Sequence, residues 1–199
     1  MGKNVSKMST HRIFAAIDIP DEVRAAVIGY IDEQKTKFRD LPIKWEKAEK
    51  LHITLKFVAE ADERQAEALD RSIGQAANLH SSFDAAISGT GAFPNFRNPR
   101  VLWLGVGTGA EQVETIAGSL ESICEKQGIP GEKKRFHPHL TIGRLRQFGR
   151  KAINIGELLR DGFGPAAFRV ERLTLYESSL SPTGSTYTVL SRHDLNGVT

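Results

Sequence analysis

Two short segments in different halves of the chain share one pattern, and this repeat constrains the fold more than any other feature. Residues 52–55 read HITL and residues 139–142 read HLTI, so each runs histidine, apolar, threonine, apolar. Such alternation is typical of a strand with one buried face, because successive side chains of a strand point to opposite sides. We interpret the pair as an internal repeat and expect two similar lobes that face each other across a cleft.

Strand-like and helix-like segments alternate along the rest of the chain, and the sequence predicts an α+β fold with helices on the outside. The expected strands cover residues 12–20, 51–58, 83–90, 100–107, 137–146 and segments near 168–177 and 185–192. The expected helices cover residues 21–38, 61–79, 110–127 and a short segment near 153–160. No low-complexity linker separates the halves. We expect a flexible N-terminal segment of residues 1–11 and a single bilobed domain of residues 12–199.

Composition argues against several protein classes. The chain of 199 residues is 40% hydrophobic and 26% charged, which is close to the average globular protein and argues against wholesale disorder. The net charge of +3 permits a phosphate-bearing partner, without the concentrated basic stripe of a typical nucleic-acid binder. Cys124 is the single cysteine, so an internal disulfide is impossible, and we expect this residue to be buried in a helix.

The sequence favours a cytoplasmic protein without a membrane partner. No apolar run is long enough to span a bilayer, and the N-terminus lacks the apolar stretch of a signal peptide. Gly2 and Ser6 match the short myristoylation pattern, and Met8 is an alternative start, so modification of Gly2 stays open. A monomer is the default expectation.

Strict alternation predicts which side chains share a strand face. In the first motif His52, Thr54 and Lys56 fall on one face. In the second motif the same rule places four residues together: His137, His139, Thr141 and Gly143. Two imidazoles and two hydroxyls would then converge on the cleft.

This set of groups suits phosphoryl chemistry. Histidine can act as acid or base near neutral pH, so two of them can take a proton from the attacking oxygen and give one to the leaving oxygen. The hydroxyls of Thr54 and Thr141 can donate to phosphate oxygens. Lys56, or a basic residue of the loop at 132–136, can balance the developing charge, and no step requires a metal or another cofactor.

Other interpretations of the histidines remain open. His137, next to Pro138, is expected to shape the start of the strand rather than to act in catalysis. A zinc site built from His52, His137 and His139 is an alternative, although no carboxylate recurs beside them at ligand spacing. The histidines outside the motifs are expected to be solvated: His11, His80 and His193.

The paired motifs and their flanks resemble the 2H phosphoesterase superfamily, and in particular the RNA 2′,3′-cyclic phosphodiesterases, also called the 2′-5′ RNA ligase family. The likeness covers nearly the whole chain. Its segments are RIFAAIDIP, LHITLKF, NPRVLWLGV, FHPHLTIGR and LTLYESSLSPTGSTYTVL. One departure is FVAE after the first motif, where the family more often has a glycine; we expect it to affect only a turn.

The resemblance implies two pseudo-symmetric α+β lobes whose antiparallel sheets line a central groove. It implies metal-independent hydrolysis of an RNA terminal 2′,3′-cyclic phosphate, or a small cyclic nucleotide, to a 2′-phosphate. His52 would protonate the leaving O3′ and His139 would activate water, with Thr54 and Thr141 holding the phosphate.

Two further residues carry weaker expectations from the resemblance. Arg144 matches a family arginine that contacts the nucleotide, although strict alternation puts it on the face opposite His139. Phe14 could stack on a base, but a core position is the better interpretation.

Two alternative functions stay open. The first is 2′-5′ RNA ligation, the reverse chemistry, in which a 5′-hydroxyl replaces water. We expect hydrolysis to dominate, since no second RNA site is evident in the sequence. The second is a non-catalytic RNA-end binding module.

Overall fold

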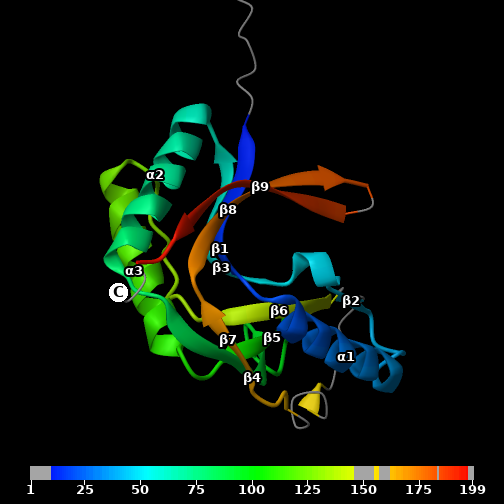
Figure 1. Ribbon diagram of the computed structural model, residues 1–199. Coiled ribbons are helices and arrows are strands. Elements are labelled where there is room, and N and C mark those ends of the chain that lie inside the picture. The colour runs from blue at the N-terminus through cyan, green and yellow to red at the C-terminus, as the bar shows by residue number, and fades with distance from the viewer. Residues whose placement is uncertain (1–9, 146–154, 157–161, 183, 197–199) are drawn as a thin grey trace, which may run out of the picture.

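The computed structural model describes residues 10–145, 155–156, 162–182 and 184–196, and its fold is α+β (Figure 1). The strands are β1 (His11–Asp18), β2 (Ile43–Trp45), β3 (His52–Ala61), β4 (Phe83–Phe93), β5 (Val101–Val106), β6 (His139–Leu145), β7 (Ala166–Val170), β8 (Arg172–Ser181) and β9 (Gly184–Asp194). The helices are α1 (Asp21–Lys37), α2 (Glu63–Leu79) and α3 (Ala110–Lys126), with a 3₁₀ turn η1 (Ala48–Lys50).

The elements agree with the sequence pattern to within a few residues at most ends, which is the usual uncertainty of element boundaries. The strand expected over 168–177 is in fact two strands, β7 and β8, separated at Glu171. The helix expected near 153–160 lies outside the described residues except for 155–156, and so does the N-terminal segment up to residue 9. β3 continues through residues 57–60 to Ala61, so the departure from the family pattern there does not fall in a turn.

All strands belong to one antiparallel sheet with the order β7-β4-β5-β6-β3-β1-β8-β9, and β2 pairs with β6 beside this path. The two motif strands, β3 and β6, are neighbours at the centre. In the described residues a single registered pair, Ile53 with Leu140, joins them. The sheet is therefore two four-stranded halves that meet at the repeated motifs, as the repeat predicts.

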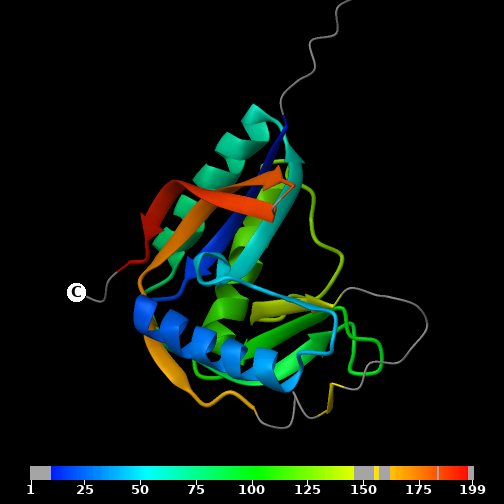
Figure 2. The same ribbon diagram turned by 90° about the vertical axis from the view of Figure 1, so that its right-hand side faces the viewer.

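The helices cover the outside of the two halves. α2 and α3 pack against each other beside β1, β3 and β8, and α1 contacts β7 and η1 (Figure 1). In Figure 2, α1 runs across the lower half while the β8–β9 hairpin stands above it. Among the residues that the structure describes, no helix combines the length and apolar character needed to cross a membrane.

Local sequence explains the helix positions. Asp62 caps α2, because its carboxylate accepts from the Gln65 backbone N–H while the Gln65 side chain accepts from the Asp62 N–H. Ala68, Leu69 and Ile73 line the buried face of α2 at helical spacing. Cys124 is fully buried in α3, as expected.

The three isolated histidines are partly exposed, and each ring also has a polar side-chain partner that the sequence did not indicate. His11 lies 2.6 Å from the Glu177 carboxylate, and His80 lies 3.0 Å from the Ser119 hydroxyl. His193 Nε2 lies 2.8 Å from Asp70, which ties β9 to α2. Each ring sits where two elements meet, and a short-range sequence pattern cannot show such a meeting.

A β-bulge in β3 changes the expected strand faces. Thr54 pairs with Ala16 of β1, and Lys56 pairs with Ala15, so Leu55 is an extra residue without a partner. An extra residue reverses the alternation beyond it. Lys56 therefore leaves the histidine face, contrary to expectation, and its side chain is buried against α3.

The buried Lys56 connects three segments. Its Nζ donates to both carboxylate oxygens of Glu121, at 2.9 and 2.8 Å, and to the Pro130 carbonyl at 2.7 Å. The Lys56 side chain is 2% exposed and that of Glu121 is 25% exposed. Glu121 also accepts from the Glu132 backbone N–H. The pair thus joins β3 to α3 and to the loop before β6.

We expect Glu121→Gln to lower the free energy of unfolding by about 3 kcal/mol, because it leaves a buried ammonium without its counter-charge. Lys56→Met combined with Glu121→Gln should recover most of this loss, since no buried charge remains. Urea titration measures both, and Glu114→Gln, on the exposed side of α3, is the matched control. Equal stability of Glu121→Gln and the control would contradict this account of the pair.

Candidate active site

Five sequence-predicted residues line one groove of about 500 Å³: His52 and Thr54 from β3, and His139, Thr141 and Arg144 from β6. The geometry of the β3–β6 junction explains why they meet. Ile53 and Leu140 pair across the junction and are fully buried, so the residues on either side of each point to the opposite face. The histidines and threonines of both motifs therefore open onto one space.

A second bulge brings Arg144 to the same groove. In the β5–β6 ladder Trp103 pairs with Thr141 and Leu102 pairs with Gly143, so Ile142 is the extra residue. Strict alternation placed Arg144 on the face opposite His139, and the bulge reverses that placement. The Arg144 Nε lies 3.4 Å from the Glu46 carboxylate, and its side chain remains 58% exposed, so the guanidinium is accessible to a ligand.

The two bulges occupy equivalent positions. Leu55 follows His52 by three residues, and Ile142 follows His139 by three residues. Bulges are enriched next to functional sites, where they redirect side chains. In the first motif the residue redirected toward the groove is Phe57, and in the second it is Arg144. Both strands of the internal repeat therefore carry a bulge at the same position. The redirected residues differ, because one strand supplies an aromatic ring and the other a guanidinium.

His52 is enclosed by aromatic rings. The Phe14 ring stacks on it with centroids 4.7 Å apart, and the Tyr187 ring meets it edge-on at 5.4 Å. Burial lowers the pKa of His52 to about 4, against smaller opposing effects from the Lys50 backbone and the Asp18 carboxylate. Its Nε2 lies 2.9 Å from the Thr54 hydroxyl. Phe14 is 2% exposed, so its main role is packing behind this ring.

His139 has a defined tautomer. Its Nδ1 lies 2.7 Å from the His137 carbonyl, which can only accept, so Nδ1 carries the proton. In the neutral ring Nε2 is then an acceptor. Burial is also the main cause that lowers the pKa of His139. The Phe93 ring packs edge-on at 4.9 Å.

His137 does not line the groove. Its ring packs against Trp103 at 4.8 Å, and β6 begins two residues later. His137 therefore lies at the start of the strand, where it lines a neighbouring cavity together with His139. In the described part of the chain, no group of three or more His, Cys, Asp or Glu side chains is arranged to hold a metal ion. The zinc alternative, which requires His52, His137 and His139 together, therefore finds no support.

Comparison with known proteins shows which family the chain belongs to. The family model of the 2′-5′ RNA ligase superfamily matches residues 20–181. The chain belongs to the 2′-5′ RNA ligase superfamily. The RNA 2′,3′-cyclic phosphodiesterase of Aquifex aeolicus is 34% identical over 177 residues, which cover 85% of this chain and 92% of that protein. The RNA 2′,3′-cyclic phosphodiesterase of Thermotoga maritima is 31% identical over 94% of this chain and 96% of its own.

Solved structures show the same fold. TT0787 of Thermus thermophilus superimposes with a TM-score of 0.77 at 31% identity, covering 94% of this chain and 98% of that one. Escherichia coli LigT complexed with 3′-AMP gives a TM-score of 0.72 at 28% identity, covering 94% and 99%. The resemblance seen in the motifs is confirmed, both for the superfamily and for its antiparallel α+β architecture.

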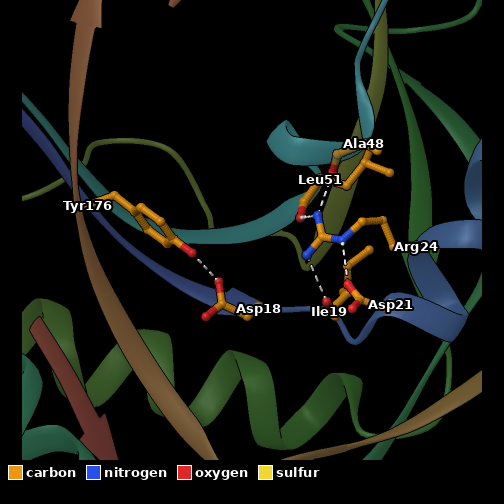
Figure 3. A network of polar contacts seen from close by, with 7 residues as sticks. All are labelled: Asp18, Ile19, Asp21, Arg24, Ala48, Leu51 and Tyr176. Atoms are coloured by element: carbon orange, nitrogen blue, oxygen red, sulfur yellow. Dashed lines mark hydrogen bonds and ion pairs between the residues drawn. The ribbon is translucent and has the colours of Figure 1, made fainter. Parts of the chain in front are cut away.

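The sequence pattern did not identify Arg24 as a site residue. Its guanidinium binds the backbone that leads into His52. Figure 3 shows its guanidinium between three carbonyl groups. It donates to the Ala48 carbonyl, to Ile19 at 2.9 Å and to Leu51 at 3.4 Å, so it links α1, the end of β1 and the start of β3. Nothing in the sequence distinguishes Arg24 from an exposed helical arginine.

Asp18 is the second missed residue. It pairs with His52 across the β1–β3 ladder. Its carboxylate accepts from the Tyr176 hydroxyl at 2.6 Å (Figure 3), and it also accepts from the Thr174 hydroxyl at 2.8 Å. These bonds fix the carboxylate beside the histidine. Burial raises the pKa of Tyr176, and the Asp18 carboxylate adds to that rise, so the phenol stays a proton donor to Asp18.

The burial of the His52 and His139 rings can be tested by measuring their pKa values. In a pH titration followed by NMR of the ring protons, we expect His52 and His139 both to titrate below pH 6.5, with His52 near pH 4. His52→Gln and His139→Gln assign the two signals. Phe14→Ala should raise the pKa of His52, because it admits water to the ring. An ordinary His52 value near 6.5 in the wild type would refute the enclosed environment.

Proposed function

We propose that this chain hydrolyses terminal 2′,3′-cyclic phosphates of RNA to 2′-phosphates without a metal. The observation that carries the proposal is the convergence of His52 and His139, each followed by its threonine, on one groove. The names of the Aquifex aeolicus and Thermotoga maritima relatives, and the 3′-AMP complex of the Escherichia coli protein, support the substrate class.

In the proposed reaction the two histidines divide the proton transfers. The free Nε2 of His139 takes a proton from the attacking water, because its Nδ1 is already committed to the His137 carbonyl. The attack forms a new P–O bond opposite O3′. His52 protonates O3′ as the P–O3′ bond breaks, which leaves a 2′-phosphate and a 3′-hydroxyl.

The remaining polar residues stabilise the charge on phosphorus oxygens. The hydroxyls of Thr54 and Thr141 donate to the non-bridging oxygens, and Arg144 supplies a cation from the His139 side. Lys56 cannot take this role, since its ammonium is buried with Glu121. Lys44 and Lys50, which also line the groove, provide further positive charge for the RNA backbone.

A general acid must carry a proton, yet the pKa of about 4 leaves the free His52 neutral near pH 7. The phosphate of the bound substrate favours the protonated form of His52, because an anion in contact with the ring stabilises the imidazolium and raises its pKa. The Asp18 carboxylate acts in the same direction. Substrate binding and protonation of His52 are therefore coupled in the proposal.

Ligation by the reverse chemistry uses the same two histidines, and a binding module would use neither. The tautomer of His139 and the aromatic enclosure of His52 favour an enzyme over a module, since binding a phosphate alone needs no ring with a depressed pKa.

We expect His52→Gln and His139→Gln each to reduce kcat on a short RNA ending in a 2′,3′-cyclic phosphate by at least about 10²-fold, the usual contribution of a general acid or base. Chromatography of the products identifies the 2′-phosphate. His80→Gln, on the outside of the fold, is the matched control, and thermal unfolding verifies that each variant folds.

Full turnover in either motif variant would reject the two-histidine mechanism. Excess EDTA should leave the rate unchanged. Loss of activity with EDTA and its return with zinc would instead support a metal mechanism.

The pH dependence follows from the depressed pKa values. The free enzyme is active with His52 protonated and His139 neutral, so kcat/KM should be bell-shaped with its maximum below pH 6.5 and should fall as pH rises. The maximum of kcat should lie at higher pH, because bound phosphate raises the pKa of His52. The two limbs belong to the coupled pair. A kcat/KM that rises steadily to pH 8 would contradict the assignment of an acid.

A further inference from the structure

Two lysine ammonium groups converge on one point in the wall of the groove. A Cβ placed on Gly184, the first residue of β9, would lie 3.3 Å from the Lys50 Nζ and 4.0 Å from the Lys44 Nζ. Lys44 belongs to β2 and Lys50 ends η1, so three segments of the chain meet at this point. Both lysines line the groove, and so does Ser185. Lys44, Lys50 and Ser185 are here called the two-lysine site.

The two ammonium groups lack a counter-charge in the part of the chain that the structure describes. Neither lysine forms an ion pair there. Glu46 brings a carboxylate to the groove, but the Arg144 Nε lies 3.4 Å from it and neutralises its charge. Like charges that approach one another repel, so an anion bound between Lys44 and Lys50 would stabilise their arrangement.

The donors of the two-lysine site suit a phosphate group. An ammonium group binds phosphate as a point charge and has three N–H donors that can rotate to meet its oxygens. The Ser185 hydroxyl can donate to a further oxygen. Such contacts from lysine and serine side chains are the usual way in which proteins hold the backbone of a nucleic acid.

The position of Lys50 relative to His52 indicates which phosphate this is. Lys50 precedes His52 by two residues, and both line the groove. In the proposed reaction the leaving O3′, with its ribose, lies on the His52 side of the cyclic phosphate. That ribose carries one other phosphate in an RNA chain, the one on O5′. The two-lysine site is therefore on the correct side of the reacting bond to meet the O5′ phosphate.

We propose that Lys44, Lys50 and Ser185 bind the phosphate on O5′ of the nucleotide whose 2′,3′-cyclic phosphate lies between the two histidines. This rests on the proposed function. The site makes and breaks no bond; it holds the substrate by its second phosphate. It thereby distinguishes an RNA chain, or a 5′-phosphorylated nucleotide, from a nucleoside 2′,3′-cyclic phosphate without a group on O5′.

Arg12 is the competing cation in the groove. It lines the same space, its guanidinium carbon lies 5.1 Å from the centroid of the Phe57 ring, and its Nε is buried without a hydrogen-bond partner in the described residues. A single cation stacked on a ring is a weaker phosphate site than two ammonium groups that meet at one point. Arg12→Gln therefore serves as the variant that separates the two placements.

The kinetic test compares three substrates that end in the same adenosine 2′,3′-cyclic phosphate. One has a free 5′-hydroxyl, one carries a 5′-phosphate, and one is a dinucleotide with a phosphodiester on O5′. We expect the wild type to show a kcat/KM at least about tenfold higher for the two substrates with a phosphate on O5′, since contacts to charged groups contribute about 1.5–3 kcal/mol. The preference should appear in KM, because the contact is the same before and during the reaction.

The variants measure how much of this preference each lysine supplies. Lys44→Gln and Lys50→Gln should each lower the preference by about threefold, and the double variant by about tenfold, as expected for partly exposed charges. The preference is a ratio within one variant, so a general loss of activity cancels. Lys47→Gln is the matched control, because this lysine lies in the same segment, is exposed and does not line the groove. Added KCl should weaken the preference of the wild type, since salt screens exposed charges.

A binding measurement tests the site without turnover. Isothermal titration calorimetry compares adenosine 2′,5′-bisphosphate with adenosine 2′-phosphate, two compounds of the product class that differ only in the group on O5′. The wild type should bind the bisphosphate at least about tenfold more tightly, and the double lysine variant should lose this difference.

Four results would overturn the proposal. The first is an equal kcat/KM of the wild type on all three substrates. The second is a preference that survives in the double lysine variant. The third is a preference lost in Arg12→Gln but kept in the lysine variants. The fourth is a gain for the dinucleotide without a gain for the 5′-phosphorylated nucleotide, because the second nucleoside would then be its source. Absence of turnover of every substrate by the wild type would refute the proposed function itself, and the calorimetric comparison would then decide on the phosphate site alone.

Discussion

The junction between β3 and β6 is the constraint on which the site depends. Two half-sheets meet there, and the registered pair of Ile53 and Leu140 sets their relation. Both side chains are fully buried, so a slip of one residue would force histidine and threonine into the core. The burial of two aliphatic residues thus places two imidazoles on one groove.

The two bulges, at Leu55 and Ile142, determine which further side chains reach the groove. A regular ladder would direct a lysine to the groove from β3 and would turn Arg144 away from it. The bulges instead direct Phe57 and Arg144 inward and move Lys56 to the buried pair with Glu121. Phe57 thus contributes an apolar ring to the groove from β3, and Arg144 contributes a cation from β6.

Aromatic packing controls the protonation of the site. Phe14 and Tyr187 exclude water from His52, which lowers its pKa, and Asp18, held by Tyr176 and Thr174, offsets part of that effect. In the proposed reaction, this ring accepts a proton when the anionic substrate binds. Arg24 fixes the backbone that leads into His52, so the ring is held from both the strand and the turn before it. Such support from packing and hydrogen bonds holds a side chain in one orientation.

The sequence by itself determined the strand and helix order, the pairing of the two motifs and the candidate histidines. These features depend on short-range periodicity and on residue type, both of which are visible in a linear pattern. Tertiary structure decided which face Lys56 and Arg144 occupy, because a bulge inserts a residue into a ladder only when the partner strand is present. It also decided the partners of Asp18, Arg24 and His193, which lie across elements far apart in the chain. Local sequence determines how apolar and polar residues alternate along each strand. Only the pairing of a strand with its neighbours determines where a bulge interrupts that alternation.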